Sequence, residues 1–493
     1  MASVIITVHV LGQVGLGFWV SVPQILAAIL TCAILEVAIT FRQSKAFVWP
    51  ASAMLTGSGV ALIMRVVGTP PGQPWSTEAW YVFAIVAGLS LLTKYVIKYK
   101  GTHVFNPSNI GLVVAFLVLG SSRAEPLDFW WAPLNVWMLA AYAVITVGGL
   151  LITRRLRLLA LAASFWVTFA VLLGILTASG HSMVTRWSFA PVTGFDFWRA
   201  IVFSPEVLIF LFFMITDPKT TPTGQVGRVV FGVLVAVVSV LLMAPQTDEF
   251  GTKVALLSGL VLVCAARPIL DRFVPEPKSA ADDLRRFVGG LRLAAPLRAG
   301  AAALVVLAIG AGVVLAGSPA RGVVVASSSE VLGRLPNQVD PGTLPPVTID
   351  DGVTDYIAGG GIQEVVVTLA QNLEFENQAL LRRDASILSA VDHGDRLAEM
   401  KGTLDALIAG AQYEPTPVSH YNFESIRATL LIPFGKQDGF SIGLISTGTL
   451  VQQWYADGEL VESKAAPFSL TFAVRRATGD RWLTVGVLDQ PPT

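Results

Sequence analysis

The sequence predicts a polytopic α-helical membrane protein that ends in a small α+β domain. Composition gives the first indication: 53% of the 493 residues are hydrophobic and 14% are charged, with a mean hydropathy of +0.64. Soluble domains carry about 25% charged residues. The second indication is a series of long apolar runs up to residue 317, and the third is an apolar–polar alternation that begins near residue 418.

The apolar runs set the number of expected membrane crossings. A membrane-spanning helix needs about 20 apolar residues, or about 17 when it is tilted, so the runs at 50–67 and 107–120 suit half-helices or re-entrant segments. We expect ten or eleven crossings. The first run starts at Met1 without a basic flank or a cleavage site, so it is expected to be a span and not a signal peptide, with further coding sequence upstream. The runs lie at 1–20, 22–41, 50–67, 79–97, 107–120, 134–153, 158–178, 200–216, 226–243, 252–270 and 298–317.

Lysine and arginine follow every second run, and this bias sets the expected orientation. Arg42 and Lys45 follow the second run, and the basic segment 271–297 follows the tenth. These loops are expected in the cytoplasm together with the N-terminus, and the last run delivers the rest of the chain to the outside. We expect a multi-pass plasma-membrane protein, with the lipid bilayer as a partner. The 34 basic and 34 acidic residues balance, so no nucleic-acid partner is indicated.

Two apolar regions are interrupted by proline, glycine and polar residues. Residues 203–224 contain Pro205 and Glu206 near their start and end in a polar loop, and residues 49–59 and the Asn-Pro turn at 103–111 form a counterpart earlier in the chain. Backbone groups freed by such breaks must pack against protein or line a cavity. Interrupted segments in corresponding halves therefore predict an inverted repeat with a binding site between the halves.

The polar residues on these segments are candidate ligands. Asp217, Lys219, Thr220 and Thr221 form a dense cluster before a new helix, which suits a phosphate or a polar ring edge. An ordinary cytoplasmic loop with an aspartate cap explains the same composition. Asn106 and Asn109 offer amide donors and acceptors beside another helix start, and His103 lies beside them.

Two carboxylates fall within or at the edge of apolar runs. A charged side chain at the centre of a bilayer costs about 2.5–3.5 kcal/mol on insertion scales, so it is usually paired or functional. Glu36 and Glu206 are therefore candidate ion-coupling residues. The alternatives are a structural partner for Glu36 and a helix cap for Glu206. Cys32 and Cys264 lie in apolar runs and have no metal-binding spacing, so no metal site is expected.

The C-terminal part has the pattern of a water-soluble domain. Residues 318–345 are rich in Ser, Gly and Pro, 370–409 have helical spacing, and 418–434, 440–455, 460–476 and 481–489 alternate as strands. Helices followed by an antiparallel meander give an α+β domain, and this order resembles a nuclear transport factor 2-like cone. His393 and His420 are expected at its surface. The expected division is a core at 1–270, a cytoplasmic connector at 271–297, one further span at 298–317, a linker and the start of the external region at 318–369, and the external domain at 370–493.

The membrane part of the chain resembles a known family. Residues 1–270 resemble the RnfD/NqrB membrane subunits of flavin-dependent electron-transport complexes, and most resemble the UnbU-type branch that actinomycetes encode with enediyne biosynthesis cassettes. The likeness covers a little over half of the chain. It rests on Glu36, Ser52-Ala53-Met54-Leu55-Thr56-Gly57, Phe105-Asn106-Pro107-Ser108-Asn109-Ile110-Gly111, Ser204-Pro205-Glu206-Val207, Thr216-Asp217-Pro218-Lys219-Thr220, and Pro222, Gly224, Arg228 and Phe231-Gly232.

The resemblance implies a ten-span core of inverted repeats with FMN or riboflavin between the halves. Family members attach FMN to a threonine at the position of Val207, and valine has no hydroxyl group, so the flavin is expected to be non-covalent. The implied cofactor-binding residues are Thr56, Asn106, Pro107, Ser108, Asn109, Ser204, Asp217, Lys219, Thr220 and Thr221. No catalytic residue is singled out.

The expected function is electron transfer across or into the membrane in support of enediyne-type biosynthesis, with a flavin or quinone-like group. Redox subunits or pathway enzymes are the expected protein partners. Two alternatives stay open: a transporter of a metabolite or ion on the same scaffold, with Glu36 and Glu206 as coupling sites, and a membrane anchor whose external domain binds a partner.

Overall fold

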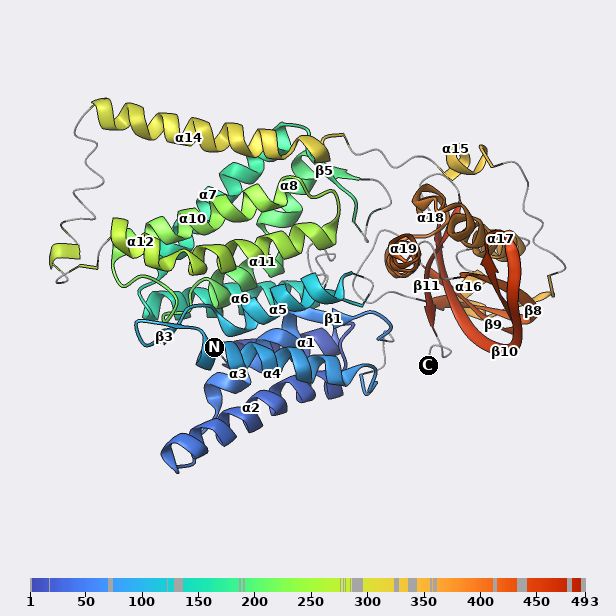
Figure 1. Ribbon diagram of the computed structural model, residues 1–493, viewed down its shortest axis with the longest axis horizontal. Coiled ribbons are helices and arrows are strands. Elements are labelled where there is room, and N and C mark those ends of the chain that lie inside the picture. Colours follow the sequence, from blue (N-terminus) through green and yellow to red (C-terminus); the bar gives the residue numbers. More distant parts are fainter. Residues whose placement is uncertain are drawn as a thin grey trace. The chain divides into compact units, whose positions relative to one another are not determined.

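The computed structural model describes residues 2–16, 18–69, 74–121, 123–127, 136–185, 188, 191–274, 276–277, 279, 281–283, 285, 296–322, 328–335, 344–354, 357, 361–410, 415–431, 441–476 and 481–488. The chain forms two compact units (Figure 1). The first, the helical unit, comprises Met1–Gly120, Ala124–Val184 and Val192–Val323, and the second, the sheet unit, comprises Ser121–Arg123, Thr185–Pro191 and Val324–Thr493. Most of the predicted connector at 271–297 lies outside the described residues.

Each apolar run of the sequence contains a helix of the helical unit. The described helices are α1 (Ala2–Val14), α2 (Val22–Ser44), α3 (Ala51–Ile63), α4 (Trp80–Val96), α5 (Pro107–Leu119), α6 (Val136–Arg155), α7 (Leu159–Ala178), α8 (Gly194–Val202), α9 (Pro205–Ile209), the π-helical turn η1 (Phe210–Met214), α10 (Gln225–Met243), α11 (Glu249–Ala265), α12 (Arg267–Phe273) and α14 (Pro296–Ala316). Short strand pairs connect them: β1 (Met64–Val66) with β4 (Ala124–Pro126), β2 (Lys98–Tyr99) with β3 (Thr102–His103), and β5 (Ser182–Met183) with β6 (Val192–Thr193).

Five described segments are long and apolar enough to cross a membrane: α2, α6, α7, α10 and Gly194–Met214. The bent pair α11 and α12 makes a sixth. α3 and α5 are short, with 13 residues each, as the lengths of their runs indicated. This is the architecture of a polytopic helical protein, and its long apolar helices are compatible with several membrane passes.

Helix starts in this unit are fixed by short sequence signals. Ser21 and Gln24 form a reciprocal capping box at the start of α2. Asn106 caps α5 ahead of Pro107, and Ser204 caps α9 ahead of Pro205. A side-chain acceptor at the cap and proline at the first helical position satisfy or remove the amide donors that a helix start leaves free.

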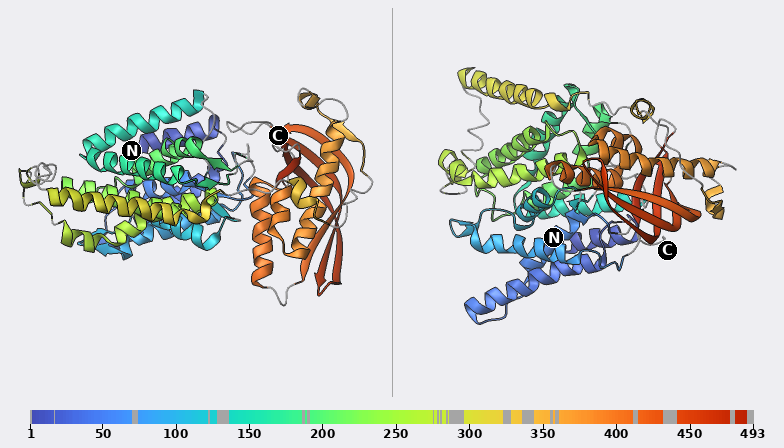
Figure 2. Two further views of the ribbon diagram at one scale, coloured as in Figure 1. Left: turned by 90° about the horizontal axis from the view of Figure 1, so that it is seen from above. Right: turned by 45° about the vertical axis from the view of Figure 1, so that its right-hand side comes forward.

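The two halves of the helical unit repeat one packing order. In the first half, α4 packs against both α2 and α5, and in the second half α10 packs against both α7 and α11. α3 contacts α1 in the first half, and α9 and η1 contact α6 in the second. Most of these helices run along a common direction (Figures 1 and 2).

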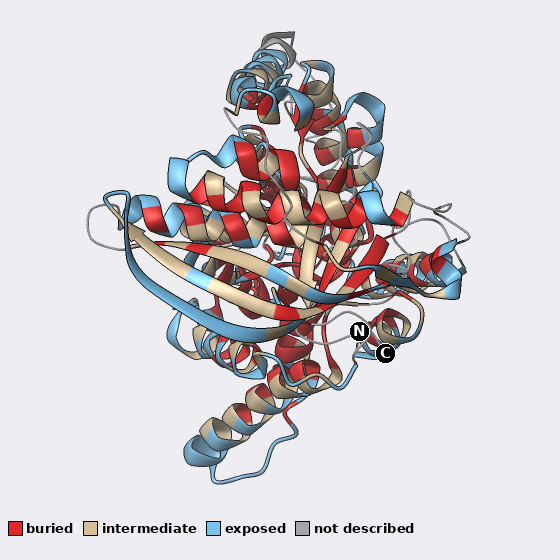
Figure 3. Ribbon diagram, turned by 90° about the vertical axis from the view of Figure 1, so that its right-hand side faces the viewer, coloured by how far each residue is buried: buried red, intermediate tan, exposed pale blue. Residues whose placement is uncertain are grey.

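The sheet unit contains a five-stranded sheet in the order β11-β10-β9-β8-β7. β8 (Thr416–Leu431), β9 (Ser441–Ala456), β10 (Glu459–Arg476) and β11 (Trp482–Leu488) form an antiparallel meander, and β7 (Val347–Ile349) runs parallel to β8. The turn between β9 and β10 places Asp457 and Gly458 at positive φ, as a tight hairpin requires. The long strands are strongly curved (Figure 3).

Helices cover this sheet. α17 (Gly361–Arg382) packs on β8 and β11, and α18 (Ala385–Val391) and α19 (Gly394–Ala409) follow it. α17 begins at Gly361, inside 318–369, the range predicted to be a linker and the start of the external region, and before residue 370, where the helical spacing was expected to begin. That segment also contains the short helices α15 (Ser328–Leu332) and α16 (Asp351–Thr354). The core joins Val366, Leu369 and Leu373 of α17 to Ile426, Leu444 and Phe472 of the sheet.

Candidate functional site

A cavity of about 190 Å³ lies in the helical unit, between α3, the start of α5 and the end of η1. Both halves of the unit supply its walls. Its lining combines apolar side chains with polar side chains from four separate segments. The residues that line it include Ser52, Leu55, Thr56, Gly59, Lys94, His103, Asn106, Pro107, Ser108, Ile152, Phe212, Phe213, Thr216, Asp217, Pro218 and Lys219.

Six of the ten predicted binding residues line this cavity: Thr56, Asn106, Pro107, Ser108, Asp217 and Lys219. The other four do not. Asn109 donates from Nδ2 to the Leu257 carbonyl oxygen at 3.0 Å, and Ser204 accepts from the Val207 amide at 3.1 Å. Thr220 donates to the Asp217 carbonyl oxygen at 3.1 Å, and Thr221 is buried nearby. The Asn109 bond joins α5 to α11, and the Ser204 and Thr220 bonds lie within a helix start and a turn.

Asn106 joins the two halves at the cavity. Its Oδ1 atom accepts from the Asn109 amide at 3.2 Å, which caps α5, and from the Ser108 hydroxyl at 2.8 Å. Its Nδ2 atom donates to the Met214 carbonyl oxygen at the end of η1, at 3.4 Å. η1 is π-helical, and such turns leave carbonyl groups outside the regular α-helical pattern. Asn106 therefore links the start of α5 to this irregular backbone.

Asp217 is fixed on two sides. Its Oδ1 atom accepts from the Lys219 amide at 3.0 Å, and its Oδ2 atom lies 3.1 Å from Nε2 of His103 on β3. Arg267 also holds this loop, because it donates to the Thr220 carbonyl oxygen at 2.6 Å. The loop that follows η1 is thus built into the wall of the cavity.

Glu36 has close partners on α4. Its carboxylate lies 2.9 Å from Nζ of Lys94 and accepts from the Tyr95 hydroxyl. Lys94 also lies 3.3 Å from the Ser52 hydroxyl and lines the cavity, although the sequence alone did not single it out. These contacts favour the structural explanation of Glu36, which does not itself line the cavity.

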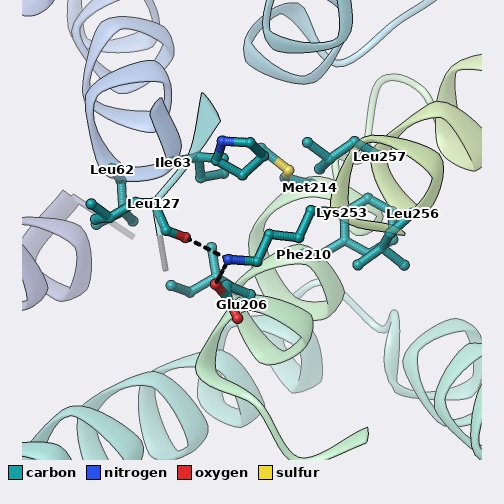
Figure 4. A pocket seen from close by; sticks show the side chains of 11 residues that line it. Leu62, Ile63, Leu127, Glu206, Phe210, Met214, Lys253, Leu256 and Leu257 are labelled. Carbon is teal, nitrogen blue, oxygen red and sulfur yellow. Dashed lines mark hydrogen bonds and ion pairs between the residues drawn. The ribbon is translucent and has the colours of Figure 1, made fainter. Parts of the chain in front are cut away.

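Glu206 lines a second, smaller pocket of about 30 Å³ (Figure 4). Nζ of Lys253 lies 3.1 Å from Glu206 and 2.7 Å from Glu249, and it donates to the Leu127 carbonyl oxygen at 3.3 Å. Sequence reasoning missed Lys253 and Glu249. The signal was present, because both are charged residues at the edge of an apolar run.

The two cavities share part of their lining. Leu62 and Ile63 of α3, Ile209 of α9 and Met214 of η1 border both of them. The large cavity and the small pocket therefore lie back to back, with an apolar partition between them. α3 and the segment α9–η1 each contribute two residues to this partition.

The sheet unit contains a buried charged group of its own. Arg396 forms two bonds to Glu376, at 2.5 and 2.8 Å, and one to Glu399 at 2.9 Å. Asp392 is fully buried, and its burial, together with the nearby Glu376, raises its pKa well above the usual range. His393 is buried, so the expectation that it lies at the surface was wrong. His420 is part-exposed, and its hydrogen bond to Glu374 raises its pKa.

No family model matches the chain, and no curated protein matches it with significance. The class of protein is therefore defined by the fold alone: a mostly helical protein whose described residues form five or six apolar helices of membrane-spanning length and a C-terminal β-sheet domain.

Proposed function

We propose that the helical unit is the core of a membrane electron-transfer protein that holds a non-covalent flavin or quinone-like group in the large cavity. One observation supports this most: the cavity gathers the Asn106-Pro107-Ser108 turn and the Asp217-Pro218-Lys219 loop, from opposite halves of the unit, into one wall. The proposal includes membership of the RnfD/NqrB-like proteins, an inverted-repeat core and a nuclear transport factor 2-like external domain.

The lining residues have the chemical properties that such a group requires. A flavin or quinone has a flat apolar face and an edge that both donates and accepts hydrogen bonds. Phe212 and Phe213 offer apolar surface, Asn106 and Ser108 offer donors and acceptors, and Lys219 offers a cation. Ligand sites are usually apolar cavities with a few placed polar groups. A bound flavin supplies one- and two-electron chemistry.

The chain's own residues would bind and orient that group. Asn106 and Asp217 are held by fixed partners, so their polar atoms are presented without a large loss of side-chain freedom on binding. Lys219 lines the cavity, and its ammonium favours negative charge there, whether on a phosphate or on a reduced ring. Val207 is buried and lacks a hydroxyl group, so no phosphoester to this residue can form.

An absorbance spectrum of the detergent-purified protein, before and after acid precipitation, tests the proposal. Flavin released into the supernatant would support a bound, non-covalent cofactor. Flavin that stays in the precipitate would contradict non-covalent binding. Protein without flavin, and without a quinone in its organic extract, would contradict the electron-transfer role.

Transport of a metabolite or ion on the same scaffold is the second candidate function. The large cavity between the two halves favours it, because transporters built from repeats bind their substrates where the repeats meet. Colourless protein that accumulates a solute in vesicles in response to a proton gradient would support this function over electron transfer.

We further propose a plasma-membrane location, with the N-terminus and the Asp217 loop in the cytoplasm and the sheet unit outside. The lysine and arginine bias of the loops supports this orientation. Redox subunits or enzymes of an enediyne-type pathway are the proposed partners. Cysteine labelling from either side of intact cells, with single cysteines at exposed Lys45 and Glu424, tests the orientation, because opposite accessibility is expected.

A further inference from the structure

The connection between α6 and α7 gathers positive charge at one end of the helical unit. Arg154, Arg155 and Arg157 lie within residues 154–157, here called the arginine turn, and all three are exposed. In the part of the chain that the structure describes, none of these three guanidinium groups forms an ion pair. The arginine turn therefore presents three positive charges that no described carboxylate neutralises.

Several other basic side chains of the helical unit are neutralised by carboxylates. Nζ of Lys94 lies 2.9 Å from Glu36. Lys100 and Arg267 each lie 2.8 Å from the carboxylate of Asp271. These cations have their partners within the chain, whereas the charge of the arginine turn is available to a partner from outside it.

Arg228 of α10 fixes the backbone of the arginine turn. Its guanidinium donates to the Arg157 carbonyl oxygen at 2.9 Å and to the Pro222 carbonyl oxygen at 3.1 Å. The carboxylate of Asp283 acts electrostatically on Arg228 and accepts from the Gln225 amide at 2.8 Å. The first turn of α7 contains no acidic residue. Asp283 therefore balances Arg228, and the three exposed arginines keep their charge on a backbone that is held in place.

Exposed leucine side chains lie next to these charges. Leu150 and Leu151 lie on the last turns of α6, and Leu156 and Leu159 lie within and just after the arginine turn. Each is between 40% and 60% exposed. Both α6 and α7 are apolar and long enough to cross a membrane. At the edge of a bilayer such leucines contact acyl chains, while arginine side chains extend to the headgroup layer.

We propose that the arginine turn and the leucines beside it bind the headgroup and upper acyl chains of an anionic phospholipid. Guanidinium groups form bidentate hydrogen bonds with phosphate oxygens, and basic clusters beside membrane helices attract anionic headgroups. Free phosphate or a soluble acidic protein would use the charges but leave the leucines in water. The inference rests on the membrane location proposed above, and it is independent of electron transfer and of transport.

Native mass spectrometry of the full-length protein in detergent, with equimolar phosphatidylglycerol and phosphatidylcholine, tests this. The wild type should retain phosphatidylglycerol preferentially. Arg154→Gln, Arg155→Gln and Arg157→Gln should each weaken its binding about fivefold, the contribution of one basic residue near an anionic lipid surface, and the triple variant should lose the most. The three substitutions to lysine keep the charge and should keep the preference.

The matched control is a triple variant of the sheet unit, Arg382→Gln, Lys401→Gln and Arg427→Gln, which removes the same charge from exposed residues. It should bind phosphatidylglycerol like the wild type. Equal retention of the two lipids by the wild type, or equal losses in the two triple variants, would overturn the proposal. Displacement of the lipid by equimolar glycerol phosphate would also overturn it, because phosphate alone would then suffice.

Each variant is compared at wild-type helix content, measured by circular dichroism. The single substitutions change exposed side chains and leave the Arg157 carbonyl oxygen in place for Arg228. They therefore test the site even if the triple variant does not fold. The measurement involves no flavin or quinone, so its failure is distinguishable from failure of the electron-transfer proposal.

Discussion

The Oδ2 atom of Asp217 lies 3.1 Å from Nε2 of His103, a residue 114 positions earlier in the chain. This contact joins the loop that follows η1 to the β2–β3 hairpin that precedes α5. Both residues line the large cavity. The two segments therefore form one wall, and a change in either residue should alter the cavity without removing a helix.

Asp217→Ala should lower the amount of bound flavin or quinone several-fold while the protein stays folded. The substitution removes the acceptor for the Lys219 amide and the partner of His103. Cofactor content per mole of protein, measured by absorbance, checks this. Asp196→Ala is the control, because that side chain is 76% exposed and lies outside the cavity. Equal cofactor content in the wild type, Asp217→Ala and Asp196→Ala would show that the cofactor binds elsewhere.

Asn106→Asp should separate the two roles of Asn106. Aspartate keeps the oxygen that caps α5 but cannot donate to the Met214 carbonyl oxygen. We expect Asn106→Ala to destabilise the protein by about 1 kcal/mol through loss of the cap, and Asn106→Asp to lose cofactor with a smaller loss of stability. Thermal unfolding together with cofactor content distinguishes the two variants; identical losses in both would contradict separate roles.

Gly57→Ala should destabilise the packing of α3 against α2. A Cβ atom at this position would lie 2.4 Å from the Ala28 carbonyl oxygen, which is backbone and cannot rotate away. The cost of such overpacking is about 1–3 kcal/mol. Gly310→Ala in α14 is the matched control, because its nearest described neighbour is 3.8 Å away. If the Gly57 and Gly310 variants melted at the same temperature, α2 and α3 would not pack this closely.

Asp392→Asn should make the sheet unit less sensitive to pH. Burial and Glu376 raise the pKa of Asp392 in the folded state, so the folded protein holds a proton that the unfolded chain releases near pH 4. The folded state therefore binds more protons across the window from about pH 4 up to the raised pKa, and its stability falls as pH rises through that window. Hydrogen exchange of α17 and α19 in the full-length protein, measured across this range, should show the fall in wild type and a flatter profile in the variant.

Glu376→Gln should destabilise the sheet unit strongly. Glu376 accepts two bonds from Arg396, and both side chains are buried. The substitution breaks a buried ion pair from one side and leaves Arg396 with the exposed Glu399 as its remaining ion-pair partner among the described contacts, and breaking such a buried pair costs about 3–5 kcal/mol. Glu399→Gln is the control, since that partner of Arg396 is 53% exposed. Faster hydrogen exchange in the sheet strands for the first variant only is the expected result.

The parts of the fold that depend on local pattern could be predicted from the sequence. Apolar run length gave the positions of the helices, and the alternation after residue 418 gave the four long strands. The start of α17 at Gly361 could not be predicted in this way, because its first turns follow a glycine-rich segment that has the composition of a linker. Local composition reports conformational freedom in the unfolded chain, whereas α17 is fixed by its contacts with β8 and β11.

The candidate site was predictable only where residues are adjacent in sequence. The Asn-Pro turn and the Asp-Pro loop stood out, and both line the cavity. Lys253 stands out as a charge at the edge of an apolar run, but its contacts with Glu206 and the Leu127 carbonyl oxygen could not be predicted, because these partners come from distant parts of the chain. Ser204 was singled out by its motif, but its hydroxyl is used to cap α9.

The four residues that border both cavities have a thermodynamic consequence. Leu62, Ile63, Ile209 and Met214 border both spaces, so an occupant of one space that shifts any of these side chains also changes the lining of the other. Occupancy of the two spaces is then linked, and linkage is reciprocal: whatever an occupant of the large cavity does to affinity in the small pocket, an occupant of the small pocket must do in return by the same factor.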